Sequence, residues 1–212
     1  MADDCCANKS ETIAVLARKS DQRRVLVIVM VINFAMFFAE FGGGLAARST
    51  ALMADSVDMF GDGVVYALSL YALNRGPRWE AGAALAKGGI ILVFGIAVIV
   101  EIADKLVNGV PPSSSLMLAF GTVALAANLT CLALLWRFRS ENINMASTFE
   151  CSRNDVVSNL GVLIAAGLVG MTEQAWPDIA VGAIIAVIFI RSAWRVLWSG
   201  GTAWRDAHLG RP

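Results

Sequence analysis

Apolar residues fall in six long blocks along the chain, separated by short polar breaks. The blocks cover about residues 25–47, 51–74, 83–107, 115–136, 142–171 and 176–198. An α-helix needs about 20 mostly apolar residues to cross the hydrocarbon core of a bilayer, and each block is long enough. Gly and Pro mark turns in breaks such as 74–78 and 108–115. The pattern predicts an all-α, polytopic membrane protein with six transmembrane helices over residues 25–198.

Composition supports this interpretation. The chain of 212 residues is 57% hydrophobic and 16% charged, whereas soluble domains are about 45–50% apolar and about 25% charged. Two polar segments remain outside the blocks, an N-terminal arm at 1–24 and a tail at 199–212. The first 20 residues contain no apolar core of the signal-peptide type. We therefore expect no cleaved signal, and the formal net charge of zero gives no reason to expect a nucleic-acid partner.

Basic residues predict the orientation of the helices, because cytoplasmic loops are rich in Lys and Arg. They gather before the first block and after the second, fourth and sixth blocks, with Arg23, Arg75, Arg137 and Arg205 as examples. Six crossings put all of these positions on one side of the membrane. We expect both termini to be cytoplasmic and the protein to lie in a plasma (bacterial inner) membrane.

Two polar pairs interrupt the second and fifth blocks. Asp58 and Asp62 are four residues apart, and so are Cys151 and Asp155. Residues four apart lie on the same face of a helix, so each pair can direct two side chains at one point. Two such helices would supply four ligands, enough for a tetrahedral divalent metal site. An acid within a membrane costs about 2.5–3.5 kcal/mol on insertion scales, and this cost favours a functional interpretation.

The mixture of donors bears on the metal. A thiolate with three carboxylates suits Zn²⁺ or Cd²⁺ better than Mg²⁺ or Ca²⁺, and it leaves Co²⁺, Fe²⁺ and Ni²⁺ open. A single membrane cysteine is usually a small apolar residue, so Cys151 is a candidate because of its spacing from Asp155. Asp55, three residues before Asp58, is either a further ligand or an acid that favours the helix N-terminus.

Four other polar residues are weaker metal candidates. Asn33 and Glu40 are seven apart in the first block, on one helix face, where they line a path or join helices by hydrogen bonds. Cys5 and Cys6, next to two aspartates, are candidates for catching soft metal ions on the cytoplasmic side. Disulfides are uncommon there, and we expect no structural disulfide.

Three further charged residues have structural interpretations. Glu150 is the simplest partner for Arg153, as a buried ion pair. Lys105 is expected at the membrane surface with Glu101. Asp178 follows Trp176-Pro177 and is expected to favour the start of its own helix.

Several motifs together resemble the cation diffusion facilitators, a family of divalent-metal/proton exchangers. The segment STALMADSVD is similar to the family's S-x-A-L-x-A-D-A-x-H/D stretch, and it is followed by Asp62. The other similar segments are Asn33 to Gly44 (N…E-x-x-G), Cys151 to Ser158 (H/D-x-x-x-D-x-x-x-S) and Trp176 to Asp178 (aromatic-x-D). The likeness covers nearly the whole membrane part.

This resemblance implies a secondary active transporter rather than an enzyme, with no prosthetic group. Asp58, Asp62, Cys151 and Asp155 are then the transport site, with Cys151 where relatives carry His or Asp. The implied function is efflux of a divalent cation, Zn²⁺ or Cd²⁺ first and Co²⁺, Fe²⁺, Ni²⁺ or Mn²⁺ as alternatives, in exchange for protons by alternating access. We expect a short form without the family's C-terminal cytoplasmic domain, and a homodimer formed through membrane helices.

Two other functions fit parts of the pattern. A passive cation channel also uses acidic residues, but conduction needs weak binding at several sites. An intramembrane aspartyl protease needs two carboxyl groups that share a proton, one from each of two helices. The FGDG sequence at 60–63 resembles such sites superficially. Two acids on one helix and a thiol on its partner fit metal coordination better.

Overall fold

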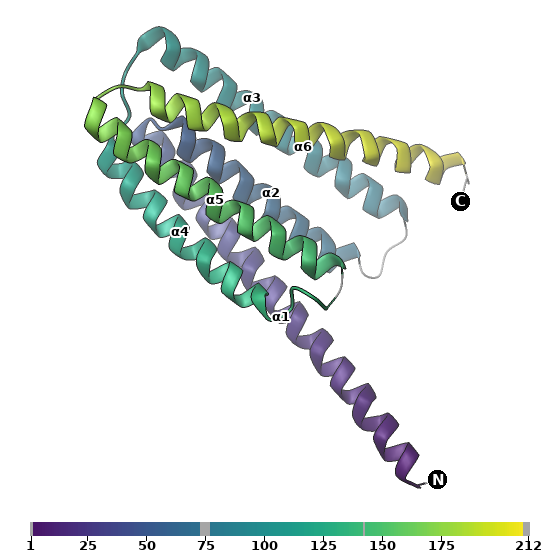
Figure 1. Ribbon diagram of the computed structural model, residues 1–212. Helices are drawn as coiled ribbons and strands as arrows, with labels where there is room; N and C mark the ends of the chain where they lie inside the picture. The colour runs from purple at the N-terminus through teal and green to yellow at the C-terminus, as the bar shows by residue number, and fades with distance from the viewer. Residues whose placement is uncertain (1, 73–76, 142, 210–212) are drawn as a thin grey trace.

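The computed structural model describes the backbone of residues 2–72, 77–141 and 143–209, and within these ranges every element of secondary structure is an α-helix. The helices are α1 (Ala2–Ala47), α2 (Thr50–Ala72), α3 (Pro77–Asn108), α4 (Ser114–Trp136), α5 (Ile143–Thr172) and α6 (Trp176–Leu209). They run alternately up and down, as Figure 1 shows. The prediction of an all-α protein with six helices is confirmed.

The bundle has two ends. The turn end holds residues 48–49, 109–113 and 173–175, where α1, α3 and α5 finish. The termini end holds residues 137–141 and is the end toward which both chain termini point (Figure 1). An even number of helices produces this arrangement.

Three helices extend beyond the predicted apolar blocks. The helix α1 is continuous from Ala2, so the predicted arm at 1–24 and the first block form one helix. Likewise α3 begins at Pro77 rather than near residue 83, and α6 continues to Leu209. Runs of apolar residues mark only the part of a helix that lies in lipid, and polar turns can continue the helix into water.

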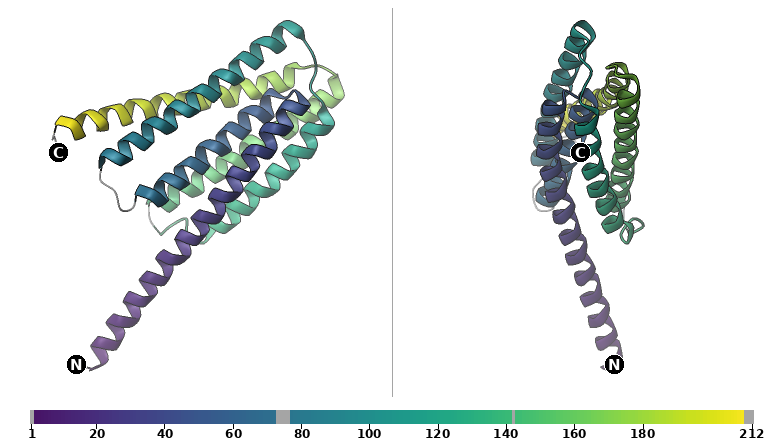
Figure 2. Two further views of the ribbon diagram at one scale, coloured as in Figure 1. Left: turned by 180° about the vertical axis from the view of Figure 1, so that it is seen from behind. Right: turned by 90° about the vertical axis from the view of Figure 1, so that its left-hand side faces the viewer.

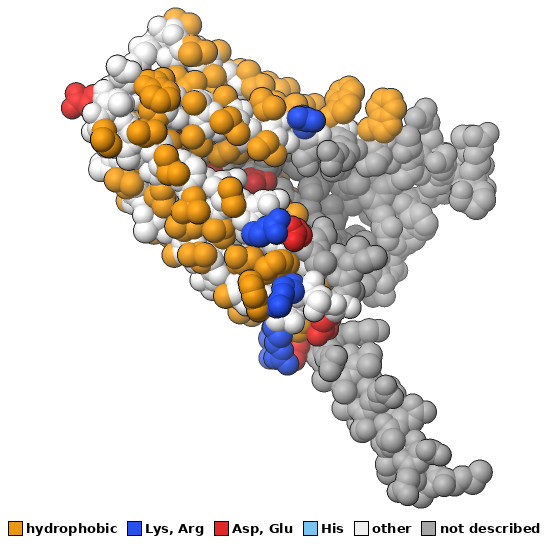
Figure 3. Space-filling model, viewed as in Figure 1, with side chains coloured by type: hydrophobic (Ala, Val, Ile, Leu, Met, Phe, Trp, Pro, Cys, Tyr) orange, Lys and Arg blue, Asp and Glu red, His pale blue; other side chains and the backbone are white. Residues whose placement is uncertain are grey.

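The outer surface of the bundle is that of a membrane protein. Segments Ser20–Ala47, Ser114–Trp136 and Thr148–Thr172 are each long and apolar enough to cross a bilayer, and Trp176–Ile188 is a shorter apolar helix. Large hydrophobic side chains cover the face shown in Figure 3. Extended apolar surfaces of this kind are rare on soluble monomers. The protein is therefore a multi-pass membrane protein.

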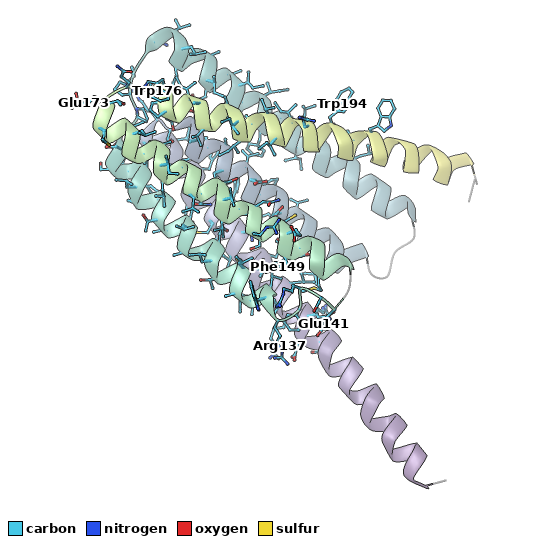
Figure 4. All side chains as sticks on the ribbon, in the orientation of Figure 1. Arg137, Glu141, Phe149, Glu173, Trp176 and Trp194 are labelled. Atoms are coloured by element: carbon cyan, nitrogen blue, oxygen red, sulfur yellow. The ribbon has the colours of Figure 1, made fainter. Side chains whose placement is uncertain are left out.

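Two tryptophans on α6 indicate how deep the helix lies. Trp176 and Trp194 both project outward from α6 (Figure 4) and are 54% and 66% exposed. They are 18 positions apart, which is about 27 Å along a helix. That length is close to the hydrocarbon thickness of about 30 Å, and Trp favours the two membrane interfaces. This stretch of α6 is therefore long enough to cross the membrane.

The helix α2 is the centre of the bundle, with contacts to all the other helices. The α3–α6 pair packs together and diverges from α1, α2, α4 and α5 toward the termini end (Figures 1 and 2). An aromatic cluster joins α2 to two neighbours: the Phe37 ring centre lies 4.9 Å from that of Phe60 and 5.7 Å from that of Phe94. The cluster thus fixes α2 against α1 and α3.

At the turn end, α1, α3 and α5 stop in the same way. The residue after each helix has a left-handed backbone: Arg48 (φ 52°), Gly109 (φ 62°) and Glu173 (φ 54°). After α1, the Ser49 N–H donates to the carbonyl of Gly44 at 2.8 Å, which is the longer bond of a Schellman motif. Two residues are enough to reverse the chain here, and they fix where α2 begins.

One buried carboxylate, Asp178 of α6, holds the start of α2. It accepts hydrogen bonds from the backbone N–H groups of Thr50 (2.8 Å) and Ala51 (3.1 Å) and from the Ser49 hydroxyl (2.5 Å). The Thr50 hydroxyl donates to it at 2.7 Å, and Lys105 of α3 forms a 2.7 Å ion pair with it. We call these five residues the Asp178 network. It ties α2, α3 and α6 together at the turn end.

The structure extends one prediction and corrects another. Asp178 lies in the first turn of α6, as predicted, but its carboxylate also serves the N-terminus of α2, because the first N–H groups of a helix have no partner within it and attract an anion. Lys105 is only 4% exposed and is paired with Asp178, so its side chain is buried in the protein and is not exposed with Glu101 at the surface. The backbones also approach closely, since a Cβ at Gly182 would lie 2.9 Å from the carbonyl carbon of Thr50.

Candidate metal centre

One face of α2 carries three polar residues at successive turns. Asp58, Asp62 and Tyr66 recur every four positions and therefore line the same side of the helix. The Tyr66 hydroxyl donates to Asp62 Oδ2 at 3.1 Å, and its side chain is 2% exposed. Asp58 and Asp62 are half-buried. The sequence prediction missed Tyr66, although its spacing from Asp62 repeats that of the two aspartates.

The second pair lies on α5, which packs against α2, α4 and α6. Cys151 is half-buried, and Asp155 is 4% exposed. The charges that act most strongly on Asp155 are those of Asp62 and Asp58. Tyr66 in turn interacts electrostatically with Asp62, Asp155 and Cys151. The four predicted ligands therefore share one neighbourhood between α2 and α5, and Figure 3 shows acidic atoms in the furrow between α5 and α6.

This neighbourhood is not a closed coordination sphere. Among the described residues, no three His, Cys, Asp or Glu side chains form a group that would hold a metal ion. Protein ligands of zinc lie about 2.0–2.3 Å from the ion. Binding one ion through all four predicted ligands would therefore need side-chain rotation or a closer approach of α2 and α5. The ligand set stays a prediction.

The weaker candidate Asn33 is 2% exposed. Its Nδ2 donates to the Val29 carbonyl at 2.9 Å and lies 4.0 Å from Cys131 Sγ. Asn33 thus joins α1 to α4, one of the two roles that the sequence left open. The side chains of Cys5 and Cys6 lie outside the described residues, and their metal-binding role stays a prediction.

The other two weaker candidates form a group with a residue that the sequence prediction missed. Glu40 and Asn159 are completely buried, and Asp55 is 1% exposed. The Glu40 and Asp55 carboxyl groups interact, and Asp55 also interacts with Asn159. Asn159 Nδ2 donates to the backbone carbonyl of Asp155 at 3.1 Å. Its position four residues after Asp155 was the signal available in the sequence.

The ion pair predicted between Arg153 and Glu150 is present, with Nη1 donating to Oε1 at 3.3 Å. The prediction that it is buried is wrong, because the two side chains are 55% and 53% exposed. Arg153 is two residues from both Cys151 and Asp155, so it points away from their face. It therefore pairs with Glu150 at the surface and not with the candidate site.

Fold and site together define a class: a multi-pass helical membrane protein with several acids enclosed at the centre of its bundle. The family model described as the cation efflux transmembrane domain matches residues 26–203. The chain belongs to this family, the cation diffusion facilitators that its motifs resemble.

Individual relatives are distant in sequence. The metal cation efflux system protein CzcD of Cupriavidus metallidurans is 25% identical over 188 residues, which cover 83% of this chain and 60% of CzcD. The zinc transporter ZitB of Yersinia pseudotuberculosis is 25% identical, over 87% of this chain and 63% of ZitB. A cadmium, cobalt and zinc/H⁺–K⁺ antiporter of Bacillus subtilis is 22% identical, over 82% of this chain and 60% of that protein. The chain thus spans about three fifths of the length of these relatives.

Proposed function

We propose that this chain forms the membrane part of a divalent-metal efflux transporter, with Asp58, Asp62, Cys151 and Asp155 as ligands of the cargo. The observation that carries the proposal is the shared neighbourhood of these side chains on α2 and α5, inside a membrane bundle. Acids are costly in lipid and mark ion pathways there. The names of relatives describe export of metal cations or transport of zinc, cadmium and cobalt.

The donor set supports Zn²⁺ and Cd²⁺ as the main cargo. Carboxylates are hard ligands and the Cys151 thiolate is soft, a combination that favours these ions over Mg²⁺ and Ca²⁺. Co²⁺, Fe²⁺, Ni²⁺ and Mn²⁺ are the alternatives within the same mechanism. Replacement of Cys151 by Ser should weaken cadmium transport more than manganese transport, since only the soft ion depends on sulfur.

Protons are the proposed counter-ion. Carboxylates and thiolates bind metal in their deprotonated form, so a proton and a metal ion compete for the same atoms. Four ionised ligands carry a charge of −4 against +2 on the ion, so at least one ligand keeps a proton or a further cation is present. An inward proton gradient then drives metal out as the bundle opens to either side in turn. The name of the Bacillus relative includes H⁺ and K⁺ antiport.

For orientation, we propose that the termini end is cytoplasmic and that the membrane is the plasma membrane. Arg137 and Arg139 are exposed at this end, where Figure 4 labels Arg137. Cytoplasmic loops are rich in such residues. The Asp178 network then lies on the outer side. A homodimer through the lipid-facing helix surfaces belongs to the same proposal and can be tested by the mass of the purified protein in nanodiscs.

The test uses the purified full chain in liposomes that contain a pH-sensitive dye, challenged with Zn²⁺ and Cd²⁺. Asp155→Asn should reduce metal-dependent proton flux by more than about 100-fold. Loss of a residue that only supports a metal ligand costs at most about 100-fold. Asp104→Asn is the matched control, because Asp104 is exposed and its partner is Asn108 on the same helix. Wild-type flux in Asp155→Asn would remove the site assignment, and metal flux that persists without a proton gradient would favour a channel.

A further inference from the structure

Three buried side chains lie one helical turn from the proposed cargo ligands, all on the side of the turn end. Asp55 precedes Asp58 by three residues on α2, and Asn159 follows Asp155 by four residues on α5. The helix α2 begins at the turn end and α5 finishes there. Asp55 and Asn159 are therefore both displaced from the proposed ligands toward the turn end, by about 5 Å along the helix axes. Glu40, in the last third of α1, meets Asp55 at this level.

This group offers buried oxygen acceptors that lack a well-placed donor in the described part of the chain. Both carboxylate oxygens of Glu40, Oδ2 of Asp55 and Oδ1 of Asn159 are buried without a hydrogen-bond partner among the described residues. Side-chain hydrogen-bond interactions link Glu40 to Asp55 and Asp55 to Asn159, but by strict distance and angle the four oxygens accept no hydrogen bond from a described donor. Buried polar atoms in native proteins are nearly always paired. A cluster of orphaned acceptors from three helices is therefore unusual.

A positive charge would satisfy the group, and in the described part of the chain the neighbouring cations are engaged elsewhere. Lys105 is paired with Asp178, and Arg153 lies on the exposed surface with Glu150. Burying an ionised carboxylate without a partner is very unfavourable. Carboxylate and amide oxygens are ligands for hard cations. A cation from outside the chain, either a proton or a metal ion, would therefore relieve this cost.

We propose that Glu40, Asp55 and Asn159 form a second cation site, through which the divalent ion passes after leaving the proposed cargo site. The inference rests on the proposed function, since it assigns a direction to the same cargo. The first site includes the Cys151 sulfur, whereas the second has only oxygen donors. It therefore holds soft ions less tightly, which favours their release toward the turn end. Its ions of choice are hard divalent cations such as Mn²⁺.

Binding stoichiometry tests this proposal. The full chain in nanodiscs is titrated with Mn²⁺, followed by the electron paramagnetic resonance signal of the free ion, and separately with Cd²⁺ by equilibrium dialysis. Wild type should bind two Mn²⁺ ions per chain. The double variant Glu40→Gln/Asp55→Asn should lose one Mn²⁺ and keep its Cd²⁺ affinity within about threefold. Asp155→Asn should lose the other ion, and Asp104→Asn should behave as wild type.

The outcomes separate the two proposals. If the double variant binds as many Mn²⁺ ions as wild type, the second site does not exist and the carboxyl groups hold protons instead. If Asp155→Asn loses no metal, the proposed cargo site fails, whatever the second site does. Retained Cd²⁺ binding reports that the double variant is folded. Should that variant misfold, Asn159→Ala replaces it. This variant should bind the weaker Mn²⁺ ion at least fivefold less tightly. Unchanged affinities for both Mn²⁺ ions would contradict the second site.

Discussion

Two groups of buried acids in this bundle differ in how their oxygens are satisfied. Asp178 accepts hydrogen bonds from two backbone N–H groups and two hydroxyls and pairs with Lys105. Glu40 and Asp55 are equally buried, yet three of their four carboxyl oxygens have no hydrogen-bond partner in the described part of the chain. A satisfied acid is a link between helices. A buried acid without a hydrogen-bond partner can still bind an exchangeable cation, such as a proton or a metal ion.

The comparison predicts opposite responses to the same kind of substitution. Removing the charge of Asp178 leaves Lys105 buried and unpaired, and loss of one partner of a buried ion pair costs about 3–5 kcal/mol. Asp178→Asn should therefore be the most destabilising change considered, as measured by unfolding of the purified protein in detergent. The double variant Lys105→Met/Asp178→Asn should lose less than Asp178→Asn alone, because no charge remains unpaired. Equal stability of Asp178→Asn and wild type would contradict the structural role.

The close approach of α6 to α2 can be tested separately from the charges. Gly182→Ala would place a methyl group 2.9 Å from the Thr50 carbonyl carbon and 3.0 Å from the Ala51 nitrogen. Overpacking of this kind costs about 1–3 kcal/mol. Gly167→Ala is the matched control, since a Cβ there meets nothing within 4 Å, and it should be neutral or slightly stabilising. Identical unfolding of the two variants would show that the contact has no energetic role.

At Glu40, removal of the charge should increase the stability of the protein, whereas at Asp178 it should decrease it. Glu40→Gln replaces an unsatisfied buried carboxyl group by a neutral amide of the same shape, so the metal-free protein should gain stability, by about 1 kcal/mol on the scale of one buried polar group. The measurement is the same detergent unfolding as for Asp178→Asn. A loss comparable to that of Asp178→Asn would mean that Glu40 is also a structural link, and the contrast between the two groups would disappear.

An effect as small as that at Glu40 is expected at Tyr66, which donates a hydrogen bond to the half-buried Asp62. Tyr66→Phe removes the 3.1 Å hydrogen bond to Asp62 Oδ2, which contributes about 0.5–1.5 kcal/mol. In zinc transport assays the variant should change KM by a few-fold and leave the maximal rate near wild type. A complete loss of transport would instead make Tyr66 part of the transport machinery itself.

Local pattern predicted the helices, because length and apolar content are visible in the sequence. Spacing along one helix also singled out the two candidate ligand pairs, whose metal-binding role stays a prediction. The same spacing contained Tyr66 and Asn159, but a phenol and an amide did not stand out among metal ligands. The Asp178 network was not predictable in this way. Asp178 lies 127 to 129 positions from its partners on the first turn of α2 and 73 positions from Lys105. Contacts between separate helices depend on how the bundle packs, which spacing within one helix does not encode.

The position of the Asp178 network has a mechanical consequence. Because α6 is fastened to α2 at the turn end, a swing of the α3–α6 pair against the other four helices has its pivot there. The helix α6 has 34 residues and is about 51 Å long at 1.5 Å per residue. A rotation of about 10° then displaces its far end by about 9 Å while the residues around Asp178 hardly move. If the proposed transport cycle uses such a swing, a small angular change at the turn end becomes a displacement of several ångströms at the termini end.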